Sequence, residues 1–180
     1  IDIGSLSNFW RAAIICLEDY LKGGRIFKSL DEPASAFLHS GTLEEKNSNF
    51  IIILSTLLGK HRSKDLTTAQ IVSFIGSRWL WELENDDEAK SYFSDVVSNS
   101  INLRNDTAHG RFPSPKFLQE TTDLQHDVLM RIYATIIHHG GIPSKDLVHS
   151  GLKGEDLVFN REWEDPIPLD IIRDDVSRWQ

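Results

Sequence analysis

The chain has 180 residues, of which 27 are Asp or Glu and 19 are Lys or Arg, so its formal net charge is −8. A chain of this length buries about 70% of the surface that its unfolded form exposes, which suits one globular domain without covalent staples. The single cysteine, Cys16, excludes an intrachain disulfide and a cysteine-based zinc cage, so we expect a reducing, cytoplasmic compartment.

The apolar runs of the sequence are short. The longest, Phe50 to Leu54, continues only through Leu57 and Leu58. This is far below the ~20 apolar residues that cross a bilayer, and no basic segment followed by an apolar one opens the chain. We therefore expect no membrane partner and no targeting leader in this sequence.

The first third of the chain predicts two helices separated by an irregular stretch. Apolar residues recur at three- and four-residue steps from Ser5 to Lys22, and Gly23-Gly24 then supplies a stop. The stretch that follows contains Pro33 and Gly41 and has no clear period. The apolar segment from Asn49 to Lys60 predicts a buried helix rather than a strand, because it lies among helical patterns.

Three further helices are predicted in the middle of the chain. Thr67 or Thr68 caps a helix that runs to Leu83, and a second helix follows from Asn85 to Leu103. The acidic run Asp86 to Glu88 is typical of a helix N-terminus, where the dipole favours carboxylates, more than of a metal site. Lys116 to His139 forms the longest helix, with apolar residues from Phe117 to Ile137 on one side. The sequence thus predicts an all-α helical bundle.

Charge and composition divide the chain near residue 140. We expect a helical domain in residues 1–140 and an irregular, acidic C-terminal tail in residues 141–180, which forms a strand or two, a wrapping arm or a linker. An acidic chain argues against a broad nucleic-acid surface, because phosphate binding depends on Lys and Arg. The stretch from Asn99 to Lys116 differs, since it carries three cations against Asp106 alone.

The most informative motif lies between the two longest predicted helices, in the segment Leu103 to Gly110. Arg104 is followed directly by Asn105 and, after four intervening positions, by His109. The spacing alone is expected roughly 0.4 times by chance in a chain of this composition, so its context carries the argument. That context consists of a long helix on each side and of the flanking residues Leu103, Ala108 and Gly110.

This pattern resembles the motif of the HEPN superfamily, helical domains of higher eukaryotes and prokaryotes. Its ribonuclease members carry an Arg, four to six residues and a His, often with Asn directly after the Arg. The resemblance covers Asp86 to Gly140 in detail, and it implies a helical bundle with long antiparallel helices at its core. It implies a metal-independent endoribonuclease like those of bacterial toxins and antiviral defence effectors, with RNA as substrate and no cofactor. It also implies a homodimer whose paired motifs form one composite site, controlled by an antitoxin or a sensor partner.

The residue types suit metal-free RNA cleavage on chemical grounds. His109 supplies an imidazole, which serves as general base or acid, while Arg104 stabilises the charge that develops on the phosphate. Asn105 orients His109 or the phosphate by hydrogen bonds. Arg111 and Lys116 are the candidate RNA-binding cations beside the motif.

The placement of the motif leaves several alternatives open. Five helical positions separate two side chains by about 140° around the axis, so Arg104 and His109 do not share a face of a straight helix. Either the helix breaks near Asp106, as Gly110 and Pro113 suggest, or the partner side chains come from a second subunit. A structural alternative pairs Arg104 with Asp106 and makes His109 a C-terminal cap. The chain is then a catalytically inactive module for dimerisation or protein interaction.

Other charged and histidine residues carry weaker signals. Arg131 and His138 also match the spacing but lie in an apolar helix, so they are interpreted as a surface charge and a helix-end histidine. His138 and His139 are adjacent and diverge on a helix, which argues against a metal site. The basic run Lys60 to Lys64 is interpreted mainly as a solvated loop.

Overall fold

The computed structural model describes residues 3–59, 64, 66–79, 86–138, 141–143, 145, 146, 148 and 149. These residues form seven α-helices and no sheet, which confirms the all-α class. The predicted tail from residue 150 onward lies outside the described residues. In chain order the helices are α1 (Ile3–Leu21), α2 (Arg25–Leu30), α3 (Glu32–His39), α4 (Leu43–Leu58), α5 (Thr68–Trp79), α6 (Asp86–Ala108) and α7 (Pro115–His138).

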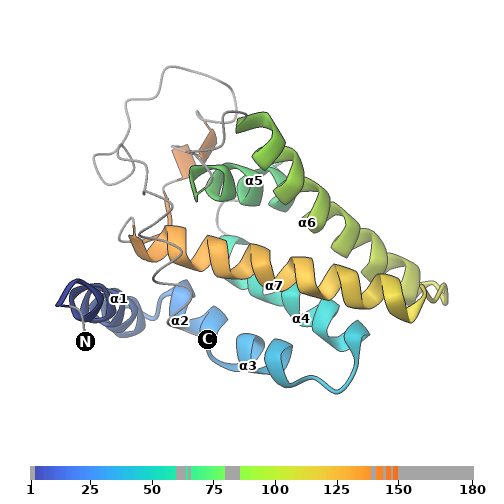
Figure 1. Ribbon diagram of the computed structural model, residues 1–180, viewed down its shortest axis with the longest axis horizontal. Helices are drawn as coiled ribbons and strands as arrows, with labels where there is room; N and C mark the ends of the chain where they lie inside the picture. The colour runs from blue at the N-terminus through green and yellow to red at the C-terminus, as the bar shows by residue number, and fades with distance from the viewer. Residues whose placement is uncertain are drawn as a thin grey trace.

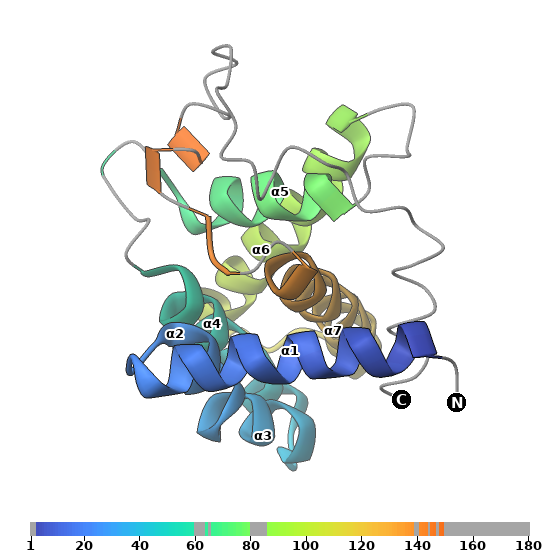
Figure 2. The same ribbon diagram turned by 90° about the vertical axis from the view of Figure 1, so that its left-hand side faces the viewer.

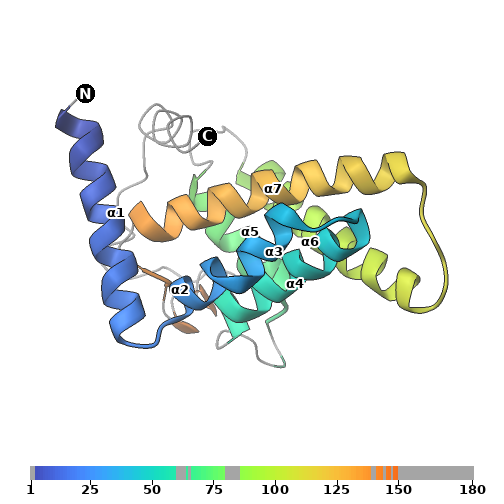
Figure 3. The ribbon, with the colours of Figure 1, turned by 90° about the horizontal axis from the view of Figure 1, so that it is seen from below.

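The two longest helices, α6 and α7, run antiparallel and converge on the short connection between them (Figure 1). Away from that connection they splay apart, and α5 packs against both of them. Helix α4 packs along α7, and α3 packs against α4 (Figure 3). Helix α1 crosses the opposite end of the molecule from the α6–α7 connection (Figure 2). The connection therefore forms an isolated tip of the fold.

The core is centred on α4 and α5, which pack against α6 and α7. From Phe50 to Leu58, apolar residues occupy several sides of α4, and most of them are buried, although Ile52 is 48% exposed. Gly76 on α5 permits the close approach of α6, because a Cβ atom there would lie 2.4 Å from the Phe93 ring. The fully buried large side chains include Phe50, Ile53, Leu54, Leu57, Leu58, Ile71, Ile75, Phe93, Ile132 and Ile136.

Side-chain caps set the starts of α4 and α5. Thr42 accepts a hydrogen bond from the Glu45 amide at 3.2 Å, so α4 begins six residues before the predicted Asn49. At α5, the Gln70 amide donates to Thr67 Oγ1 at 3.3 Å and the Thr67 amide donates to Gln70 Oε1 at 2.9 Å. This reciprocal capping box identifies Thr67, rather than Thr68, as the cap.

The irregular stretch predicted after the first helix is wrong, because α2 and α3 occupy it. Pro33 lies at the start of α3, where backbone amides have no hydrogen-bond partner within the helix. The missing amide hydrogen of proline therefore costs no helical hydrogen bond there. Both helices are short, and they are held by contacts with α4.

Near the C-terminal end of the described residues, Ile142 and Val148 pack against the main core. No helix in the described ranges is long and apolar enough to span a bilayer.

Candidate functional site

The Arg104 motif lies at the tip where α6 ends (Figures 1 and 3). Arg104, Asn105 and His109 are all exposed, whereas Leu103 immediately before them is only 4% exposed. Leu103 therefore anchors the last turns of α6 to the body of the domain. The three candidate catalytic side chains take no part in the core and are free to meet a ligand.

The backbone at the end of α6 forms a Schellman C-cap. Gly110 adopts a positive φ of 74°, its amide bonds the Thr107 carbonyl at 3.0 Å, and the Arg111 amide bonds the Asp106 carbonyl at 2.9 Å. The His109 amide still reaches the Asn105 and Asp106 carbonyls, at 3.1 and 3.0 Å. Helix α6 thus continues unbroken past Asp106 to Ala108, with His109 as its C-cap, so the alternative of a break at Asp106 is not the one observed.

The side chains of the motif do not form the ion pair that the structural alternative predicted. Asp106 Oδ1 lies 3.3 Å from Arg111 Nη1, because the turn at Gly110 brings Arg111 back over the last helical turn. Arg104 Nη2 instead donates to Asn105 Oδ1 at 3.3 Å. In the described part of the chain, no carboxylate pairs with the Arg104 guanidinium. His109 does occupy the C-cap position that the same alternative assigned to it.

An unbroken helix decides how the three side chains face. Asn105 and His109 are four positions apart, about 40° around the axis, and so lie on one face. Arg104 and His109 are five positions apart, about 140° around the axis, and so point in different directions. A single copy of the chain therefore presents Arg104 and His109 on different faces of α6.

The two candidate RNA-binding cations lie at the same tip. The side chains of Arg111 and Asp106 are 76% and 49% exposed. Lys116 Nζ lies 3.7 Å from Glu120 Oε1, in a pair that is also largely exposed. Exposed pairs of this kind contribute about 0–1 kcal/mol, so either cation can exchange its carboxylate for a phosphate at little cost.

Exposed apolar residues at the tip were missed by the sequence interpretation. Phe112 is 76% exposed in the connection, and Phe117 and Leu124 on α7 are 45% and 43% exposed. The first half of α7 instead buries a largely polar set: Leu118, Thr121, Thr122 and Gln125. The sequence signal was available for Phe112, which stands between Arg111 and Pro113 in a segment without helical periodicity.

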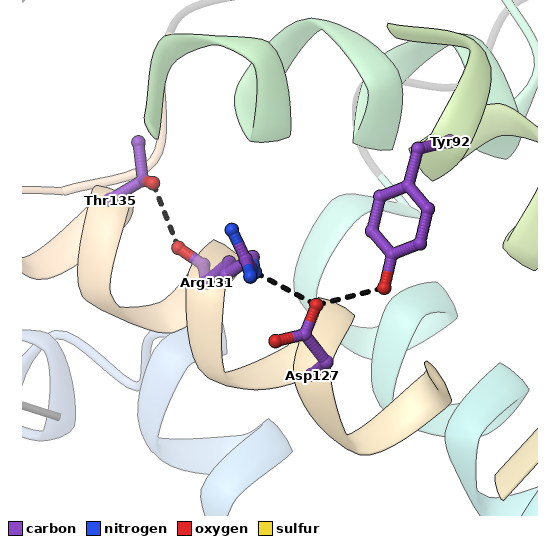
Figure 4. Close-up of polar contacts among 4 residues, drawn as sticks. All are labelled: Tyr92, Asp127, Arg131 and Thr135. Carbon is purple, nitrogen blue, oxygen red and sulfur yellow. Dashed lines mark hydrogen bonds and ion pairs between the residues drawn. The ribbon is translucent and has the colours of Figure 1, made fainter. Parts of the chain in front are cut away.

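A second polar cluster joins α6 to α7 away from the tip (Figure 4). Asp127 Oδ2 accepts from Tyr92 Oη and from Arg131 Nε, each at 2.8 Å. Burial raises the pKa of Tyr92, helped by the hydrogen bond and negative charge of Asp127 and opposed by the charge of Arg131. Arg131 is thus partly buried and paired with Asp127 within α7, rather than the surface charge predicted, and the link to α6 is made by Tyr92. His138 ends α7, as expected, and its side chain lies outside the description.

Other sites within the described residues offer little chemistry. No three His, Cys, Asp or Glu side chains there are grouped so that they could hold a metal ion. Burial and the Asp19 carboxylate raise the pKa of the Cys16 thiol, which makes it a weak nucleophile. A shallow depression between α3 and α4 is lined by acidic side chains, including Glu32 and Glu45, and is unsuited to phosphate.

Comparison of the chain with protein-family models, with curated proteins and with solved structures gives no match. The functional argument therefore rests on the residues at the tip.

Proposed function

We propose that the protein is a metal-independent endoribonuclease that acts as a homodimer, in the manner of a toxin or an antiviral defence effector. The observation that carries the proposal is the exposure of Arg104, Asn105 and His109 together on the tip of the α6–α7 hairpin. None of these side chains is needed to fill the core. They combine an acid–base group, a permanent cation and an amide, the set that RNA cleavage requires.

In the proposed reaction the RNA supplies its own nucleophile. One imidazole removes the proton of a 2′-hydroxyl, the resulting oxygen attacks the adjacent phosphorus, and a protonated imidazole donates to the leaving 5′-oxygen. Two copies of His109 provide the base and the acid. Arg104 neutralises charge on the phosphorane, and Asn105, on the same helical face as His109, orients the imidazole or the phosphate. The products are a 2′,3′-cyclic phosphate and a 5′-hydroxyl, and DNA is resistant.

A second copy solves the geometric problem of the single chain. Arg104 and His109 diverge by about 140° on one helix, so the opposite copy must complete each half of the site. We propose that α6 and α7 form the dimer interface with the two motifs near its twofold axis. The exposed Phe117 and Leu124 on α7 support this interface, because they offer apolar surface beside the motif.

The test is cleavage of a mixed single-stranded RNA by the purified protein, with and without a chelator. We expect cleavage in both conditions and cyclic-phosphate ends by mass spectrometry. His109→Ala should lower the rate about 10²- to 10⁴-fold and abolish any toxicity, while circular dichroism and dimer mass stay unchanged. His39→Ala, which changes an exposed histidine on α3, is the matched control and should cleave normally. A His109→Ala protein that cleaves like the parent contradicts the proposal, as do 5′-phosphate ends.

Substitutions of Arg104 test the role of the cation separately. Arg104→Ala should cripple cleavage, and Arg104→Lys should restore little, because a point charge does not reproduce the guanidinium fork. Neither change should alter stability by more than about 0.5 kcal/mol, since the side chain is exposed and, among the described residues, hydrogen-bonds Asn105 alone. Full activity of Arg104→Lys would show that the mechanism does not require bidentate binding of the phosphate by the guanidinium.

The second candidate is a catalytically inactive module for dimerisation or protein interaction. Two observations favour it: His109 occupies the C-cap of α6, and apolar side chains are exposed nearby. Light scattering combined with the cleavage assay discriminates the two functions. A stable dimer that leaves RNA intact under all activating conditions supports the module, whereas a monomer that retains activity contradicts the composite site.

A further inference from the structure

Among the residues whose side-chain exposure the structure gives, Phe112 is the most exposed large apolar side chain, at 76%. Burial of a phenylalanine side chain contributes about 1.5–3 kcal/mol to the stability of a folded protein, and the exposed Phe112 loses most of that contribution. Along the chain, Phe112 follows His109 by three residues. Three residues of extended chain span at most about 11 Å, so the ring is carried close to the proposed catalytic histidine.

The connection holds Phe112 at the tip by features on both sides. Gly110 turns the chain out of α6 with its positive φ, and the Arg111 amide is fixed to the Asp106 carbonyl. Pro113 disfavours a helical backbone at Phe112, and residues 111–114 are not helical. Ser114 Oγ then accepts from the Phe117 amide at 3.3 Å at the start of α7. A short segment between two capped helix ends keeps the ring from folding back into the core.

The charge around Phe112 favours a nucleic acid over an apolar protein partner. Arg104, Arg111 and Lys116 lie near it in sequence, in a chain whose net charge is −8. Arg111 and Lys116 are paired with Asp106 and Glu120 in exposed, exchangeable ion pairs, and Arg104 is paired with no carboxylate of the described residues. An aromatic face next to cations matches an unpaired base joined to its phosphate. The apolar residues Phe117 and Leu124 lie further along α7.

We propose that Phe112 is a stacking platform for an unpaired base next to the scissile phosphate, with Arg111 binding the phosphate of that nucleotide. The substrate is therefore single-stranded RNA, because bases within a duplex already stack on one another and do not offer a free face. This inference rests on the proposed function for the identity of the scissile phosphate. The binding event itself does not require that cleavage take place.

The experiment measures binding in the full chain carrying His109→Ala, so that the RNA stays intact. Fluorescence anisotropy of a labelled single-stranded RNA 12-mer gives the Kd. Adding Phe112→Ala should weaken binding about 5- to 150-fold, and Phe112→Trp should preserve it. Leu21→Ala is the matched control, because Leu21 is 74% exposed on α1 and should leave the Kd unchanged. The same RNA in duplex form should bind more weakly and show no dependence on residue 112.

The possible outcomes separate the two proposals. An unchanged Kd for Phe112→Ala, or no RNA binding at all, overturns the stacking platform. A Phe112→Ala variant that lowers the dimer mass in light scattering without changing the Kd makes Phe112 a contact between copies instead. If RNA binding depends on Phe112 while the parent protein cleaves no RNA, the stacking platform stands and the nuclease proposal fails.

Discussion

A buried polar network between α4, α6 and α7 should show strong coupling between its members. Asn47, Ser100 and Gln125 are each at most 2% exposed. Gln125 Nε2 donates to Asn47 Oδ1 and, at 2.9 Å, to Ser100 Oγ. Asn47 Nδ2 donates to the Ser100 carbonyl at 3.1 Å. Gln125 Oε1 is buried without a partner among the described residues, so the network is incompletely satisfied.

Removing the side-chain amide of either Asn47 or Gln125 leaves a polar atom of the other one buried without its hydrogen-bond partner. Gln125→Leu keeps the side-chain volume but leaves Asn47 Oδ1 buried without a donor, which costs about 1–3 kcal/mol. The loss of the unpartnered Gln125 Oε1 offsets part of that cost. Asn47→Ala leaves Gln125 Nε2 with Ser100 Oγ alone and should cost a similar amount. The double variant contains no Asn47 oxygen that lacks a donor. Its loss of stability should therefore be smaller than the sum of the losses of the two single variants by about 0.5–3 kcal/mol.

Urea unfolding of the four proteins in the cycle measures this coupling. Each kcal/mol should also lower Tm by about 2–4 °C in a domain of this size. Gln119→Leu is the matched control, because Gln119 is exposed on α7 and its side chain hydrogen-bonds Asp123 alone in the described part of the chain, so the substitution should cost within about 0.5 kcal/mol. Costs that add within about 0.5 kcal/mol would refute the argument that the network acts as a unit.

Three further predictions concern backbone and titration. Gly76→Ala should destabilise by about 1–3 kcal/mol in urea unfolding, because the new Cβ would lie 2.4 Å from the buried Phe93 ring. Gly110→Ala should cost about 1–2 kcal/mol from its φ of 74° alone, whereas Gly41→Ala, which also meets open space, should be near neutral. Burial raises the pKa of Tyr133 to about 12 from an ordinary value near 10. Protonated Tyr133 therefore contributes its full stabilisation of the folded state below pH 10, and the free energy of unfolding should fall between pH 10 and 12. Tyr133→Phe should reduce this fall when the free energy of unfolding is measured across the same pH range.

The elements that the sequence determined are those with local causes. Helix ends follow from caps within a few residues, as at Thr67, where a capping box forms, and at Gly110, where only a left-handed backbone closes the C-cap. The exposure of Arg104 and His109 also has a local origin, since they flank the end of a polar helix. A sequence pattern is sufficient at these positions because the interactions span no more than five residues.

Tertiary structure decided which partners these local elements meet. Helices α2 and α3 are too short to be stable alone, so their formation depends on contact with α4, which no periodicity reveals. Helical periodicity marks the face of α7 that could be buried, yet Gln125 lies inside while Phe117 is half exposed. A buried amide is tolerated only where another helix supplies its hydrogen-bond partners, and here Asn47 lies 78 positions earlier in the chain. Whether a polar side chain can be buried thus depends on residues that are distant in the sequence. The free-energy cost of its desolvation is offset by hydrogen bonds that exist only once the helices have packed.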